Sequence, residues 1–164
     1  MLREPPSIGL PGSEAVRVGW REPVALPAFG IGAIKAKLDS GARSSALHVE
    51  GLDVHGEGGA MVARFGVRVR RRGHALLACA APVCDRRRIT DSGGHRSERW
   101  FIRTTLVLAG IAFEAEVSLA DRAGLLFPLL LGRSAIASRF LIDPALSYTL
   151  RLPRPSRPHA PPPA

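Results

Sequence analysis

Short apolar stretches that end at glycine or proline recur along most of this chain, and they restrict its possible folds more than any other feature. They follow one another at intervals of roughly ten residues, and several alternate apolar with polar side chains, as half-buried strands do. The clearest pair is 100–108 and 111–119, joined by Ala109-Gly110. The pattern therefore predicts an all-β fold.

The same signals place the remaining elements. Segments 61–72 and 75–83 predict a hairpin that turns at Gly73. The polar, glycine-containing segment 85–99 predicts a long exposed hairpin or loop, and 134–140 predicts the one short helix. We expect further strands at 18–26, 34–38, 127–133 and 147–152, with a turn at 140–144.

The length of 164 residues suits one domain that needs neither metal nor disulfides for its core. Segments 1–17 and 153–164 are predicted to be disordered tails, the second rich in proline, around a folded domain of 18–152. The two cysteines fit a reducing compartment. Because no secretion signal or membrane-length apolar run is present, we expect a cytoplasmic protein that does not enter the membrane.

The chain is strongly basic, with a formal net charge of +9, and all its Lys+Arg residues except Lys35 and Lys37 are arginines. Such a surface attracts nucleic acid, anionic membranes or acidic peptides, although genomic base composition alone can also produce an arginine excess. The basic residues are not interleaved with stacking aromatic residues, which disfavours nucleic acid as the partner.

Candidate chemistry lies at the end of segment 34–38. Its alternating residues predict a half-buried strand, which would present Asp39-Ser40-Gly41-Ala42 at its tip. An ordinary Asp-Ser-Gly turn is the competing interpretation. A second motif, Leu130-Leu131-Gly132-Arg133, ends another apolar strand just before the predicted helix.

Together these motifs resemble the retropepsins, single-domain aspartic proteases in which an apolar-apolar-Gly strand supports a catalytic Asp-Thr/Ser-Gly loop. The longer match, 33–48 with 91–94 and 130–133, resembles the small bacterial retropepsin-like family labelled ATP-dependent zinc proteases. Its members are often found beside the ligase that adds glutamates to a ribosomal protein. The resemblance implies a closed, barrel-like monomer with one short helix, a homodimer, and aspartic endopeptidase activity on a peptide or protein substrate.

The resemblance also assigns roles to residues. Two nearby carboxylates share one proton, so one activates a water while the other polarises the peptide carbonyl. One chain would supply Asp39 and a symmetry-related copy the other carboxylate. Ser40 would lock the two loops together, Gly41 would admit the substrate backbone, and Ala42 would keep the pocket wall small. The residues implied to support this loop are Leu131, Gly132 and Arg133.

A second Asp-Ser-Gly occurs at 91–93, but it does not predict a dyad within one chain. Asp91 follows no alternating strand, and two lobes do not fit in a core of about 135 residues. Under the resemblance, Ser92, Gly93 and Gly94 would form the tip of a flap that closes over substrate. An ordinary surface turn remains the alternative.

The chain departs from the retropepsin pattern at Arg43, where many retropepsins have an aspartate that pairs with the later arginine. Arg133 therefore needs another partner, and Asp121 and Glu98 are the candidates. Arg43 also suggests that the cleft favours acidic peptides.

No zinc or ATP motif accompanies this pattern. The chain has no His-Glu-x-x-His and no phosphate-binding loop, and the spacing of His74, Cys79, Cys84 and His95 matches no known zinc site. His48 is interpreted as structural. We therefore expect no metal and no cofactor. The rival to a peptidase is a retropepsin-like module without turnover that binds acidic partners or nucleic acid.

Overall fold

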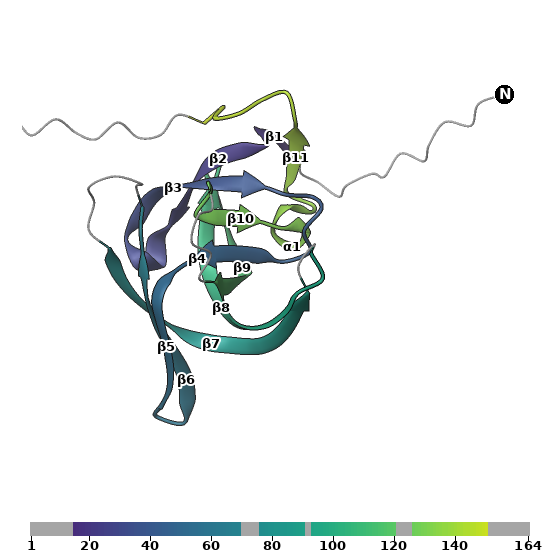
Figure 1. The fold of residues 1–164 in the computed structure, drawn as a ribbon. Coiled ribbons are helices and arrows are strands. Elements are labelled where there is room, and N and C mark those ends of the chain that lie inside the picture. Colours follow the sequence, from purple (N-terminus) through teal and green to yellow (C-terminus); the bar gives the residue numbers. More distant parts are fainter. Residues whose placement is uncertain (1–14, 70–75, 91–92, 121–125, 151–164) are drawn as a thin grey trace, which may run out of the picture.

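Six strands form a closed barrel at the centre of the computed structural model, which describes residues 15–69, 76–90, 93–120 and 126–150 (Figure 1). Strand β8 pairs with β2 and so closes the barrel. In barrel order the strands are β2 (Arg21–Leu26), β3 (Ile31–Leu38), β10 (Leu129–Leu131), β4 (Ser45–His48), β9 (Ile111–Ala120) and β8 (Arg96–Leu108). The all-β, retropepsin-like fold predicted from the sequence is confirmed.

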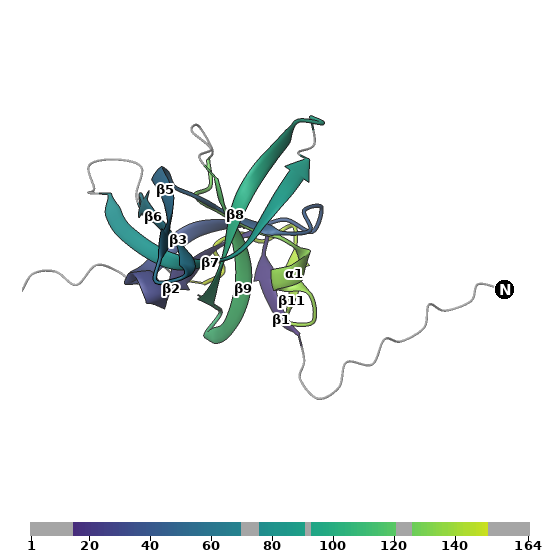
Figure 2. The same ribbon diagram turned by 90° about the horizontal axis from the view of Figure 1, so that it is seen from below.

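Three strands continue the sheet beyond the barrel from β8: β7 (Leu77–Thr90), β6 (Ala60–Val67) and β5 (Glu50–Glu57). The β5–β6 hairpin projects from the barrel in Figure 1, and the β7–β8 hairpin projects in Figure 2. Both hairpins are therefore held at one end only. A short 3-10 turn, η1 (Pro27–Phe29), connects β2 with β3.

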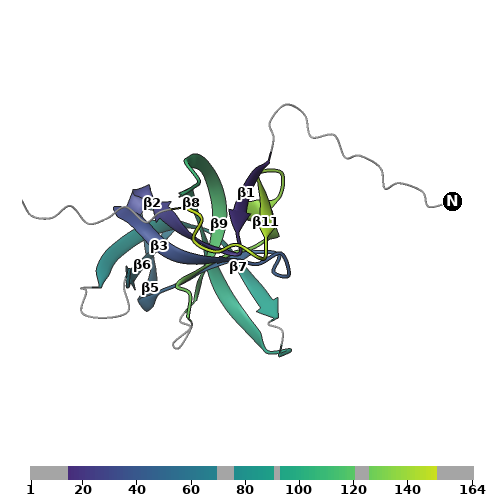
Figure 3. The same cartoon turned by 90° about the horizontal axis from the view of Figure 1, so that it is seen from above.

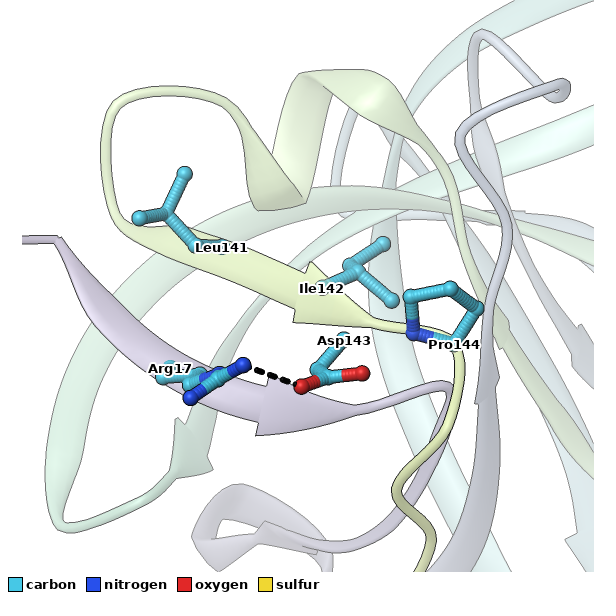
Figure 4. Close-up of a pocket in the computed structure, with 5 residues that line it drawn as sticks. All are labelled: Arg17, Leu141, Ile142, Asp143 and Pro144. Carbon is cyan, nitrogen blue, oxygen red and sulfur yellow. Dashed lines mark ion pairs between the residues drawn. The ribbon is translucent and has the colours of Figure 1, made fainter.

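The first and the last strand pair beside the barrel. Strand β1 (Val16–Gly19) pairs in parallel with β11 (Phe140–Asp143), next to helix α1 (Arg133–Ile136) (Figure 2). At this edge Arg17 forms an ion pair of 2.5 Å with Asp143, beside a shallow cavity of about 310 Å³ (Figure 4). None of the predicted site residues lines this cavity.

The core is aliphatic, as expected for a chain with 5% aromatic residues. One face of β9 supplies Phe113, Ala115, Val117 and Leu119, all buried, as its alternation predicted. Burial of this kind contributes about 1.5–3 kcal/mol for each large side chain. The barrel is therefore held together by strand faces that alternate in and out.

Two predicted strand pairs are confirmed. Residues 101–108 of β8 pair with 111–118 of β9, and β6 pairs with β7, although the turn at Gly73 lies outside the described residues. Within the predicted hairpin or loop at 85–99, residues 85–90 pair as an extended strand with residues 96–101. The single strand expected at 18–26 is instead two strands separated at Trp20, and β4 and β5 have no counterpart among the predicted elements.

The short helix predicted in the C-terminal part is present, but its bounds and the elements after it differ from the prediction. The helix covers only Arg133–Ile136, because Ala137 has an extended backbone and Ser138 has a left-handed φ of 65°. Phe140 then turns into the core against Phe113, with ring centroids 5.6 Å apart. The expected turn at 140–144 contains strand β11, and residues 147–150 form no strand.

Candidate active site

The backbone of Asp39 is fixed from two sides where β3 ends. The N–H of Leu38 donates to the carbonyl of Trp20 at 2.8 Å, and the N–H of Asp39 donates to the carbonyl of Leu131 at 2.8 Å. The first bond leads to the corner between β1 and β2, and the second leads to β10. The strand tip is thus held between two neighbours that are far apart in sequence.

The Asp39 carboxylate is partly exposed and has two partners. Its Oδ1 accepts from the N–H of Gly41 at 3.0 Å, its Oδ2 lies 3.2 Å from Nζ of Lys37, and its side chain is 27% exposed. Partial burial would raise the pKa of Asp39, but the Lys37 ammonium and the N–H groups of Gly41 and Ala42 outweigh it and lower that pKa. The carboxylate is therefore held ionised and accessible.

The loop after Asp39 is tight and has small side chains. The N–H of Ala42 donates to the carbonyl of Asp39 at 3.2 Å, which closes a turn over Ser40 and Gly41. A Cβ atom on Gly41 would lie 3.1 Å from Oδ1 of Asp39. Glycine therefore leaves room beside the carboxylate that a larger residue would narrow.

Gly132 lets the supporting strand approach this loop. A Cβ atom here would lie 2.5 Å from the carbonyl oxygen of Ser44, which belongs to the backbone and cannot rotate away. The close contact permits two hydrogen bonds, from the N–H of Arg133 to the carbonyl of Ala42 at 2.8 Å and from the N–H of Ser134 to the carbonyl of Arg43 at 3.1 Å. The structure thus brings the two sequence motifs together.

Arg133 supports the loop through its backbone carbonyls. Its Nη1 donates to the carbonyls of Ser40 at 3.0 Å and of Gly41 at 3.2 Å. Of the two carboxylates considered as partners, Glu98 pairs with Arg86, and Asp121 lies outside the described residues. Arg43 is exposed and forms no ion pair with another described residue.

Two buried serines that sequence reasoning missed complete the support. Oγ of Ser45 accepts from the N–H of Gly132 at 3.1 Å, and its carbonyl accepts from the Ser118 hydroxyl at 3.1 Å. Both side chains are buried. The alternation of residues 45–48 is a signal that could have found β4 and hence Ser45. Lys37 was missed as well, although residues two apart in a strand share a face.

The proposed flap lies at the turn between β7 and β8. Asp91 and Ser92 are outside the described residues, whereas Gly93 and Gly94 are exposed, and Gly94 has a φ of +81° that favours glycine. One carboxylate connects the two strands at the base of this hairpin: Glu116 on β9 accepts from Arg87 on β7 at 2.6 Å and from Arg103 on β8 at 3.0 Å. These hydrogen bonds lower the pKa of Glu116, with burial opposing them.

No group of three or more His, Cys, Asp or Glu side chains within the described ranges could hold a metal ion. His74, one member of the set considered from the sequence, lies outside those ranges. Cys79 is buried, and burial raises the pKa of its thiol, so it stays protonated near neutral pH. Among the described residues, no helix is long and apolar enough to span a membrane.

A closed barrel with an Asp-Ser-Gly loop supported by a Leu-Leu-Gly strand defines a retropepsin-like protein. A family profile described as retropepsin-like aspartic endopeptidase RimB matches residues 17–152, and the chain belongs to this RimB-like family. The resemblance drawn from the motifs is therefore confirmed.

Three relatives illustrate the range of similar proteins. Two are named probable alpha-L-glutamate ligase: one from Shewanella pealeana is 35% identical over 81% of this chain, and one from Desulfotalea psychrophila is 38% identical over 81%. This chain spans only 29% of the length of each. The crystal structure of a Legionella pneumophila protein of unknown function matches with a TM-score of 0.70 and 27% identity, covering 83% of this chain and 98% of that one.

Proposed function

We propose that this protein is an aspartic endopeptidase in which Asp39 and the Asp39 of a second copy activate a water to hydrolyse a peptide bond. The observation that carries the proposal is the Asp39 carboxylate itself, which is oriented by the N–H of Gly41 and remains partly exposed beside small residues. Water and a substrate carbonyl can reach such a carboxylate. The RimB-like family description agrees with this activity.

A second copy is required because the described part of one chain forms one such loop. Acid-protease chemistry needs one ionised and one protonated carboxyl group, which share a proton because two adjacent negative charges repel. A symmetric dimer would place the two Asp39 loops face to face on its axis. The pair would then titrate as a unit with two apparent pKa values.

The exposed arginine beside the loop supports acidic peptides as substrates. Arg43 lies four residues beyond Asp39, is exposed, and forms no ion pair within the described ranges. The net charge of +9 adds a general attraction for anionic chains. Rim charges of this kind mainly affect association, so the preference should weaken as salt is added.

Cleavage assays with one matched pair of peptides test the proposal. A glutamate-rich peptide and its glutamine counterpart are incubated with the wild type, with Asp39→Asn and with Arg43→Glu. We expect Asp39→Asn to fold and to lose cleavage of both peptides, whereas Arg43→Glu loses only the preference for glutamate. Arg64→Glu on β6 makes the same charge change at an exposed position away from the loop and serves as the control. Unchanged cleavage by Asp39→Asn would refute the aspartic mechanism.

One observation favours a binding module without turnover. Lys37 neutralises the Asp39 carboxylate within a single chain, so the loop is electrostatically satisfied before any second copy arrives. Such a module would bind the glutamate-rich peptide without cleaving it, and Asp39→Asn would leave binding intact. The same two peptides therefore discriminate between the two functions.

A further inference from the structure

Glu22 on β2 is a buried carboxylate that the site described above does not use. Its side chain is fully buried, with 0% exposure. Its Oε1 accepts from the N–H of Gly19 at 2.8 Å, from the N–H of Thr149 at 3.0 Å and from the Thr149 hydroxyl, and its Oε2 accepts from the N–H of Leu150 at 3.1 Å. Because a buried carboxylate is costly unless its lone pairs are occupied, these donors must stay together.

Two of the donor residues belong to residues 146–150, which we call the C-terminal strap. In Figure 3 this segment runs from the end of β11 across β2. The carbonyl of Leu146 accepts from the N–H of Trp20 at 3.0 Å, and the N–H of Tyr148 donates to the carbonyl of Arg21 at 2.9 Å. The strap thus bonds to three consecutive residues, of which Glu22 is the third.

The contact between the strap and the barrel is close. A Cβ atom on Gly19 would lie 2.6 Å from the carbonyl oxygen of Leu146, so only glycine lets the two backbones approach. The Arg21 guanidinium lies 4.5 Å from the ring centre of Trp20 and 5.0 Å from that of Tyr148. These cation–π contacts add to the hydrogen bonds and join the strap to the start of β2.

The same three residues hold the end of the catalytic strand. In the β2–β3 pair, Arg21 lies opposite Lys37 and Glu22 lies opposite Ala36. The carbonyl of Trp20 accepts from the N–H of Leu38, the residue directly before Asp39. A continuous set of hydrogen bonds therefore runs from the strap through residues 20–22 to the strand tip that carries Asp39 and Lys37.

We propose that Glu22 is a positioning residue for Asp39: by fixing the C-terminal strap against residues 19–22, it sets the place of the β3 tip and hence of the Asp39 carboxylate. The catalytic consequence rests on the proposed function, whereas the positioning itself does not. Acid-protease chemistry requires two carboxyl groups within hydrogen-bond reach, and misplacement of a reacting group by about 1 Å can cost about 100-fold in rate.

Glu22→Gln removes one defined contact. The amide oxygen can take the place of Oε1 and keep the donors from Gly19 and Thr149, but the amide NH₂ then faces the N–H of Leu150. Two donors cannot pair, so the end of the strap is released with little change in side-chain volume. Thr149→Val is the milder variant, because it removes only the hydroxyl and keeps the backbone N–H bond.

The experiment follows the ¹³C carboxyl titration of Asp39 and the hydrogen exchange of the Leu38 and Asp39 amides in the full chain. In Glu22→Gln we expect the carboxyl titration of Asp39 to shift from that of the wild type and both amides to exchange at least about 10-fold faster relative to Leu106 in β8. Thr149→Val should shift both in the same direction by less. Where peptide is cleaved, kcat should fall about 10- to 100-fold with KM nearly unchanged.

Glu50→Gln is the control, because it removes a carboxylate on β5 that pairs with Arg68, just after β6 and away from the strap. It should leave the titration of Asp39 unchanged. The proposal is overturned if strap amides exchange faster in Glu22→Gln while the Asp39 titration and the Leu38 amide stay as in wild type. If Glu22→Gln does not fold, Thr149→Val decides by the same criteria. Absence of cleavage by the wild type refutes the proposed function alone.

Discussion

Replacement of Gly132 by alanine tests how the supporting strand holds the loop after Asp39. Gly132 has an ordinary extended backbone with φ −88°, so alanine causes no conformational strain of its own. The difficulty is space, because the new Cβ would lie 2.5 Å from the carbonyl oxygen of Ser44, whereas ordinary contacts begin at 3.4 Å. The loop containing Ser44 must therefore move by roughly 1 Å.

The size of the effect follows from what that movement disturbs. Overpacking of this kind costs about 1–3 kcal/mol. Three hydrogen bonds cross the same contact, from the N–H groups of Gly132, Arg133 and Ser134 to the segment 42–45, and each contributes about 0.5–1.5 kcal/mol. We expect Gly132→Ala to lower the free energy of unfolding by about 2–4 kcal/mol, since the bonds weaken without all being lost.

Urea denaturation measures this loss, with Gly32→Ala as the matched control. Gly32 lies on β3, and a Cβ atom there would have no neighbour within 4 Å. Its replacement should change stability by less than about 1 kcal/mol, in the stabilising direction. Equal stability of the two variants would show that the contact between Gly132 and Ser44 does not support the loop.

Two further predictions concern the groups around Asp39. Lys37→Met removes the cation that lowers the pKa of Asp39, so that pKa should rise. The ionised carboxylate stabilises the fold above its unfolded pKa, and this stabilisation is lost as pH falls through the folded pKa, so in the variant it should be lost at higher pH. The pH profile of cleavage should also move to higher pH. An unmoved profile with a correctly folded variant would contradict this. Ser45→Ala leaves the buried N–H of Gly132 without an acceptor and should cost about 1–3 kcal/mol in urea denaturation, whereas Ser134→Ala, exposed on α1, should cost much less.

The strands could be predicted because alternation is local, whereas the closed barrel and the meeting of the two loop motifs followed from the resemblance to retropepsins. Alternation in 111–119 places apolar residues on one face of β9, and the strand ends that carry Asp-Ser-Gly and Leu-Leu-Gly meet as the resemblance implied. The contact between Gly132 and Ser44 is the physical reason why the second motif needs its glycine.

The remaining features depend on contacts between distant residues. The sequence around Glu22 is that of an ordinary exposed strand residue. Its hydrogen bonds with the strap, which include one from Thr149, 127 residues later, make it a buried acceptor. The sequence suggests a carboxylate partner for Arg133, whereas its guanidinium donates to two carbonyls of the loop itself. The helix stops early because Ala137 and Ser138 leave the helical conformation, after which Phe140 packs against Phe113, and no pattern in 134–140 reveals this.

Subunit mixing tests the central claim, that each copy supplies half of a catalytic site, most directly. Wild-type protein is mixed with an equal amount of Asp39→Asn and allowed to exchange subunits, and cleavage of the glutamate-rich peptide is compared with that of the wild type alone at the same concentration of wild-type chains. If mixed dimers are inactive, the rate should fall to about half, because half of the wild-type chains then pair with the variant. An unchanged rate would show that one chain carries a complete site, and it would contradict the account.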